Sequence, residues 1–155
     1  MSDFNILAKL VEGHGVASGK TEDSRFPHGT IAMQMPYFKQ RGLELNSFFK
    51  GSLNLDVSPY SFDLLEPDYS FSQIKWSQDF PAENFSFYSC SLVLPESGLG
   101  SISHAGFIYR PHPSTKPGFH QNPNVLEVIA PFIPNLNYGD FLNLKCSSRI
   151  IHFQK

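Results

Sequence analysis

The stretch 85-FSFYSCSLVLP-95 changes side-chain character from one position to the next along much of its length. Successive side chains of a β-strand point to opposite faces, so alternate positions lie together. The two faces would carry these sets: Phe85, Phe87 and Ser89 on one, and Tyr88, Cys90 and Leu92 on the other. The alternation predicts a β-strand with bulky side chains on both faces.

Strand-like runs recur along the chain, with Gly, Pro, Asn and Ser between them. They are residues 5–18, 29–38, 50–58, 103–111, 125–133 and 141–153. Twelve prolines and eleven glycines interrupt the chain too often for long helices. The expected helix is a short one at residues 36–42, with Pro36 in its first turn. Many short strands separated by turn signals predict a mainly β fold, a closed or nearly closed β-barrel.

The length and composition predict one globular domain, residues 1–155. Apolar residues make up 41% of the chain and include fifteen Phe, enough for a bulky core. Residues 58–85 show no clear period and are expected to cover one side of the barrel as an irregular segment. Residues 110–124 hold four prolines and two histidines, and a long loop of this kind is more often functional than not.

The net charge and the lack of targeting signals argue against a nucleic-acid-binding, secreted or membrane-inserted protein. The formal net charge is -2 and no basic run stands out, which argues against nucleic acid as a partner. Residues 1–13 lack a basic start followed by a long apolar core, and no window approaches the length of an apolar membrane span. We therefore expect a cytoplasmic protein with no membrane partner.

The two cysteines, Cys90 and Cys146, do not form a CxxC pair, so the chain has no tetrahedral sulfur set for zinc. Two buried free thiols in strands are the favoured interpretation over a disulfide. The six histidines show neither HxH nor HExxH spacing, and no GxSxG segment is present. These absences argue against a histidine metal site and against a conventional serine hydrolase.

The segment 12-EGHGVASGK-20 ends a predicted strand in glycines and continues into Ser18, Gly19 and Lys20. Backbone amides near glycine approach a phosphate closely, and a lysine supplies the positive charge. The spacing is one residue too short for a GxxxxGK[ST] loop. A phosphate-binding turn and an ordinary glycine-rich turn both remain open at this point.

The segment 50-KGSLNLDVS-58 places two neutral oxygens on one face of a predicted strand. Leu53 and Leu55 share one face, so Ser52 and Asn54 share the other. Mg²⁺ commonly takes only one or two protein oxygens when phosphates supply the remaining charge. The alternatives are a solvent-facing strand side and a magnesium site.

Glu127 lies within the strongly apolar run 125-VLEVIAPFI-133. Leu126 and Val128 should point away from it, while Val125 and Ile129 share its face. A carboxylate on such a face is costly unless it is hydrogen-bonded or paired. Structural burial against a backbone partner is one interpretation, and contact with a substrate hydroxyl as acceptor or general base is the other.

Four segments together resemble the CTP-dependent riboflavin kinase family, best known from archaea. They are 11-VEGHGVASG-19, 35-MPYFKQRGLELNSFFKGSLNL-55, the pair 87-FYSCSLVLP-95 and 104-HAGFIYRP-111, and 126-LEVIAPFIPNLNYGDFLNL-144. They occur in the family's order and span most of the chain. The GSLNL and EVIAP segments match the family's G[TS]LNL and E[IV]IAP patterns and are the most specific.

The resemblance implies a small, closed, six-stranded β-barrel of the cradle-loop type, with one short helix and long loops. It implies transfer of the γ-phosphate of CTP to the ribityl 5′-hydroxyl of riboflavin, giving FMN and CDP, with Mg²⁺ as cofactor. The expected partners are these two small molecules, and the expected state is a monomer or a weak homo-oligomer.

The resemblance also assigns site residues. It implies Ser52 and Asn54 as magnesium ligands, Glu127 as the catalytic residue at the flavin's ribityl end, and Thr115 as a flavin contact. The implied nucleotide-binding residues are Ser18, Gly19, Lys20, Phe132, Ile133, Pro134 and Asn135. Two other classes stay open: a flavin- or nucleotide-binding barrel of the same fold without transfer activity, and an all-β domain that binds a carbohydrate or a protein partner.

Overall fold

The computed structural model describes residues 3–12, 30–78, 81–96, 100–112, 123–134 and 136–155. Within these residues the structure is mainly β with one short helix, the fold class that the sequence predicted. The elements in chain order are β1 (Asp3–Val11), α1 (Thr30–Gln40), β2 (Leu53–Asp56), β3 (Ser61–Leu64), β4 (Tyr69–Ile74), β5 (Glu83–Glu96), β6 (Gly100–Pro111), β7 (Val125–Ile129), β8 (Phe141–Ser147) and β9 (Ile151–Gln154).

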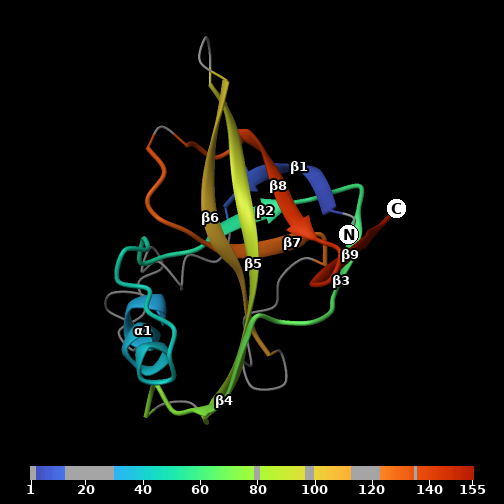
Figure 1. Cartoon of the computed structure of the whole chain (residues 1–155). Coiled ribbons are helices and arrows are strands. Elements are labelled where there is room, and N and C mark those ends of the chain that lie inside the picture. The colour runs from blue at the N-terminus through green and yellow to red at the C-terminus, as the bar shows by residue number, and fades with distance from the viewer. Residues whose placement is uncertain (1–2, 13–29, 79–80, 97–99, 113–122, 135) are drawn as a thin grey trace.

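Six strands form a ring in the order β5-β6-β7-β2-β1-β8, and the antiparallel pairing of β5 with β8 closes it. The long strands β5 and β6 run through the full height of the molecule (Figure 1). β4 pairs with the first part of β5, at Phe85–Phe87, whereas β8 pairs with a later part, at Cys90–Val93. One edge of β5 therefore serves both the ring and an extension beyond it. β3 and β9 form a separate two-stranded sheet.

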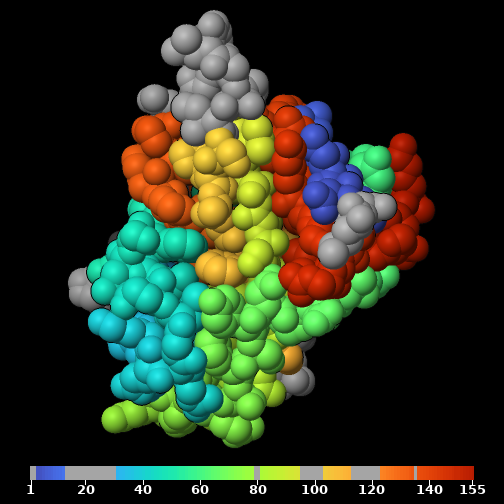
Figure 2. Space-filling model, in the orientation of Figure 1, coloured from blue at the N-terminus to red at the C-terminus, as the bar shows by residue number. Residues whose placement is uncertain are grey.

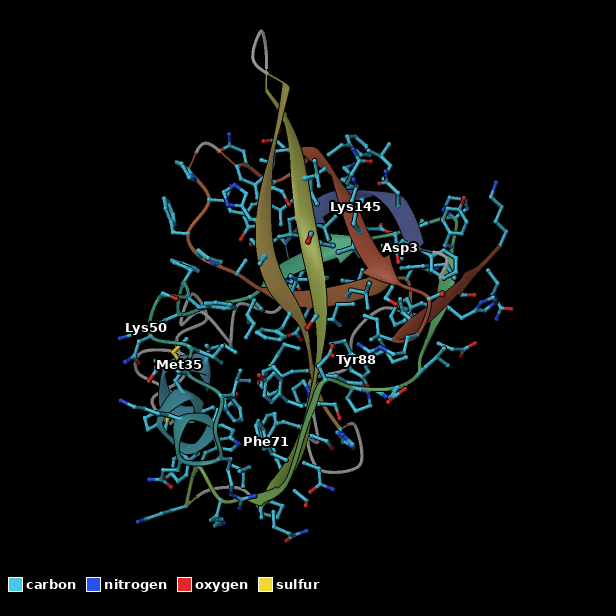
Figure 3. The ribbon with its side chains drawn as sticks, viewed as in Figure 1. Asp3, Met35, Lys50, Phe71, Tyr88 and Lys145 are labelled. Atoms are coloured by element: carbon cyan, nitrogen blue, oxygen red, sulfur yellow. The ribbon has the colours of Figure 1, made fainter. Side chains whose placement is uncertain are left out.

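The alternation of residues 85–95 correctly placed Phe85 and Phe87 opposite Tyr88, Cys90 and Leu92, and the two faces of β5 line two different buried clusters. Tyr88, Cys90 and Leu92 belong to the inner cluster, which the ring strands surround and which also receives Leu55. Phe85 and Phe87 belong to the outer cluster, which packs α1 against β4, β5 and β6. Figure 3 shows Phe71 of β4 in the layer between α1 and the strands.

The helix begins earlier than the sequence predicted, and it replaces a predicted strand. α1 spans Thr30–Gln40, whereas the expected helix was 36–42 and residues 29–38 were assigned to a strand. Ile31, Met35 and Phe38 recur at helical spacing and are all buried, so this period outweighs the alternation of Ile31, Met33 and Met35. Pro36 lies inside the helix on its exposed side. The helix and the chain that follows it lie directly against the β4 region (cyan against green, Figure 2).

Two further predictions need correction. The segment 58–85 is not wholly irregular, because it contains β3, β4 and the start of β5. The predicted strand 141–153 is two strands, β8 and β9, separated by a turn in which the Ile150 amide donates to the Ser147 carbonyl at 3.1 Å. β3 pairs with β9, although the two strands are far apart in the sequence. A pairing of this kind leaves no signal in either segment alone.

In the described ranges, no helix is long and apolar enough to cross a membrane.

Candidate functional site

Pairing of β2 with β7 places Asn54 directly opposite Glu127. Directly opposed side chains of an antiparallel pair project from the same face with their Cβ atoms about 4.5–5.5 Å apart. The structure thus brings together two residues that the sequence singled out separately, one in GSLNL and one in EVIAP. An amide oxygen and a carboxylate lie side by side on the outer face of the ring.

The neighbours of these two residues explain why their side chains face outward. Leu55 is fully buried in the inner cluster and Leu53 packs against it, while Leu126 and Val128 fill the same cluster from β7. Strand alternation then turns Asn54 and Glu127 to the other face, as predicted. Ile129, on the same face as Glu127, belongs to the outer cluster.

Ser52, Asn54 and Glu127 are all half-buried, and one carboxylate oxygen of Glu127, Oε2, is itself buried. Ser52 lies immediately before β2 and two positions from Asn54. Asn54 and Glu127 also interact with the surrounding protein. They form a cross-strand pair, with Ser52 two positions before Asn54 in the chain.

The donor set suits a hard cation. Mg²⁺ prefers oxygen ligands and binds through one or two protein groups together with phosphates. The hydroxyl of Ser52, the amide oxygen of Asn54 and the carboxylate of Glu127 are all of this type. Within the described ranges, no group of three or more His, Cys, Asp or Glu side chains is arranged to hold a metal ion. A cation at this site would therefore need ligands from the neutral protein oxygens and from the phosphates of a bound substrate.

Two exposed aromatic rings lie on the segments that flank β2 and β7. Phe49 precedes β2 and Phe132 follows β7, with side chains 45% and 67% exposed. Their ring centroids are 5.8 Å apart, and the Phe49 amide donates to the Ala130 carbonyl at 3.0 Å, which ties the two loops together. Lys50, also exposed, follows Phe49 on the side of α1 (Figure 3). The segments that flank β2 and β7 therefore expose two aromatic rings, with a lysine next to Phe49 in the chain.

The other members of the segment after β7 have different environments. Ile133 is buried in the inner cluster, so its side chain contributes to packing, whereas Pro134 is exposed. Asn135 lies outside the described residues, as do Ser18, Gly19 and Lys20 of the glycine segment and Thr115 of the loop 110–124.

A buried polar pair lies behind the carboxylate of Glu127. The Tyr109 hydroxyl of β6 donates to Gln34 Oε1 of α1 at 2.5 Å, and both side chains are buried. Burial raises the pKa of Tyr109 well above its ordinary value, and the negative charges of Glu127 and Glu83 raise it further. Tyr109 is therefore a neutral donor at physiological pH, close enough to Glu127 to sense its charge.

A second buried pair joins Trp76 to Glu83. The Trp76 Nε1–H donates to Glu83 Oε2, and Glu83 is only 1% exposed. Sequence reasoning identified neither pair. Gln34 sat in a segment assigned to a strand, and Trp76 sat in a segment assigned to irregular structure. The lone Trp of the chain, seven positions before a Glu in an aromatic-rich segment, was the one available signal.

Comparison of the chain with protein-family models, with curated proteins and with solved structures finds no match.

Proposed function

We propose that this protein is a nucleotide-dependent riboflavin kinase-like phosphotransferase that uses CTP and Mg²⁺ in the cytoplasm. The observation that carries the proposal is the opposition of Asn54 and Glu127 across β2 and β7. Their motifs, GSLNL and EVIAP, are the two most specific parts of the resemblance. In the same proposal, the ring of six strands is a closed barrel of the cradle-loop type.

The residues of the site divide the work of phosphoryl transfer between them. Ser52 and Asn54 would hold Mg²⁺, which would supply neutralisation of charge on the phosphates. Glu127 orients the ribityl 5′-hydroxyl and accepts its proton as the oxygen–phosphorus bond forms. The bond between the γ-phosphorus and its bridging oxygen breaks, and CDP leaves with FMN as the other product. Such a reaction depends mainly on positioning and charge, so few catalytic side chains are needed.

Tyr109 affects Glu127 because it is a neutral group near the carboxylate. Its raised pKa keeps the hydroxyl neutral, so no second negative charge develops behind the carboxylate. Its hydrogen bond to Gln34 connects the strand next to β7 with α1. A neutral, hydrogen-bonded pair, Tyr109 and Gln34, therefore lies near the carboxylate.

The direct test is product formation. The pure protein is incubated with riboflavin, Mg²⁺ and each of CTP, ATP, GTP and UTP, and FMN is separated and quantified by its fluorescence. FMN is expected with CTP. Asn54→Ala should lower turnover at least about 100-fold, the order seen when an electrostatic stabiliser of a transition state is removed. Asn143→Ala on β8 is the matched control, because it removes a half-buried amide from another strand of the ring.

The exposed rings of Phe49 and Phe132 favour a second candidate, binding of a flavin or a nucleotide without transfer. Both ligands carry a planar heteroaromatic ring, and stacking on an aromatic side chain contributes about 1–3 kcal/mol per base. Quenching of riboflavin fluorescence by the protein, together with no FMN from any of the four nucleotides, would support this candidate and overturn the kinase. Loss of quenching in Phe132→Ala would place the flavin on this ring pair.

A further inference from the structure

The two cysteines of the chain face each other across the strand pair that closes the ring. Cys90 of β5 is the direct antiparallel partner of Cys146 of β8. Both are free in the structure, and both are buried, at 7% and 4% exposure. The sequence predicted two buried free thiols, but it did not predict that they are neighbours.

Both sulfur atoms lie on the interior side of the ring. Cys90 and Cys146 are members of the inner cluster, together with Leu92 and its direct partner Leu144. Side chains of one face of a strand pair point the same way, so the two thiols share the same interior space. Partners in an antiparallel pair have Cα atoms about 4.5 or 5.5 Å apart, and a disulfide needs about 4.4–6.8 Å. The backbone therefore already has the spacing that a disulfide requires.

We propose that Cys90 and Cys146 are a dithiol site that a small disulfide or peroxide oxidises to a cross-strand disulfide, locking the ring shut. With glutathione disulfide as oxidant, one thiolate attacks it and releases one glutathione. The second thiolate then displaces the other glutathione, so two glutathione thiols form for each protein disulfide. Two electrons and two protons leave the cysteine pair, and one sulfur–sulfur bond forms.

The position of the pair gives the bond a structural effect. β5 and β8 are far apart in the chain, and their pairing is the one that turns a row of strands into a ring. A cross-link between distant positions restricts the unfolded chain strongly and so stabilises the fold. The candidate site on β2 and β7 belongs to two other strands of the ring, so oxidation changes stability and leaves the site residues in place.

Burial also makes the oxidation slow in the folded protein. The pKa of Cys90 is raised well above its ordinary value by burial and then by the nearby Cys146. Burial, with a contribution from Asp3, raises the pKa of Cys146 to about 12. Thiolate is scarce at neutral pH, and an oxidant reaches the pair only when the β5–β8 edge opens. The reduced pair is the resting form under reducing conditions.

The test compares the full chain before and after oxidation, by two routes. In one route, the folded protein is incubated with glutathione disulfide. In the other, protein unfolded in guanidinium is refolded in a buffer of reduced and oxidised glutathione, so that access does not limit the reaction. We expect an intact mass lower by about two hydrogen atoms, loss of both titratable thiols after denaturation, and migration as a monomer on non-reducing gels. The midpoint of thermal unfolding should rise by about 5–10 °C.

Cys90→Ala and Cys146→Ala are the controls, since each leaves one thiol and shortens one side chain of the same pair. In the oxidising buffer, neither variant should show the loss of two hydrogen atoms in its intact mass or the rise in its thermal unfolding midpoint. The proposal is overturned if refolded wild-type protein keeps two thiols, carries glutathione adducts or forms disulfide-linked dimers. It is equally overturned if the intramolecular disulfide forms and lowers the unfolding midpoint, because the folded ring would then reject the bond.

Discussion

The inside of the ring and the layer under α1 are both well buried, yet they are built from different chemistry. Aliphatic side chains such as Leu92, Leu142 and Leu144 dominate the inner cluster. The layer under α1 is rich in aromatic rings and adjoins two buried polar pairs, Gln34–Tyr109 and Trp76–Glu83. The interior of the ring is therefore held by aliphatic packing, whereas the aromatic layer contains Tyr109, whose pKa the charge of Glu127 helps to raise.

The largest expected effect comes from removing the aromatic side chain of Phe38, at the centre of the outer cluster. Phe38 is fully buried, and its ring contacts those of Phe71, Phe85 and Phe87 at centroid distances of 5.0–5.9 Å. Phe38→Ala should lower the free energy of unfolding by about 3–5 kcal/mol. Denaturant titration measures it, with Phe141→Ala, an exposed ring, as a control expected to change little. Equal effects of the two substitutions would contradict the packing described for α1.

The matching change inside the ring is Leu144→Ala. The side chain is fully buried, so the cavity and lost burial should cost about 2–5 kcal/mol, again measured by denaturant titration. At temperatures where the variant is folded, its turnover should equal that of the wild type. The control is Leu7→Ala, at a side chain 58% exposed on β1. A large loss of turnover in folded Leu144→Ala protein would show that the interior also shapes the site.

A smaller effect is expected from the buried polar pair. Tyr109→Phe removes the donor to Gln34 Oε1 and should cost about 1–3 kcal/mol of stability, because a buried acceptor loses its partner. Replacing both partners, as Tyr109→Phe with Gln34→Leu, should recover part of that loss. A double-mutant cycle by denaturant titration gives the coupling. Purely additive losses would mean that the two groups contribute independently.

The smallest effect concerns a partly exposed ion pair outside both clusters. Arg149 Nη2 lies 2.7 Å from Asp68 Oδ1, and the Ser89 amide donates to Asp68 Oδ2 at 2.7 Å. Burial alone would raise the pKa of Asp68, but these contacts outweigh it and hold that pKa below its usual value. A carboxyl with a lowered pKa stabilises the fold above its unfolded pKa, near 3.9, and loses that contribution as the pH falls through its folded pKa. Stability measured from pH 6 down to pH 2 should therefore fall less steeply in Asp68→Asn than in the wild type. Identical slopes would remove Asp68 from the acid response.

The local alternation of side chains predicted which residues share a face of a strand, but it could not predict which distant strands pair. It placed Tyr88 and Phe87 on opposite faces, and it placed Leu126 and Val128 on the face opposite Glu127, as the structure confirms. It failed at α1, because Ile31 and Met35 fit both a strand period with Met33 and a helical period with Phe38. It also missed the pairs Gln34–Tyr109 and Cys90–Cys146, whose partners lie far apart in the chain. Register between strands decides such pairs, and no single segment carries it.

One paired measurement tests the division between the two regions most directly: the rate of FMN formation and the free energy of unfolding for wild-type protein and Glu127→Gln. Asp63→Asn, an exposed acid on β3, is the matched control. The expected result is FMN formation with CTP in the wild type and in the control, a loss of at least about 100-fold in Glu127→Gln, and unfolding free energies within about 1 kcal/mol of each other. No FMN from the wild type with any nucleotide, or equal turnover in Glu127→Gln, would contradict the account.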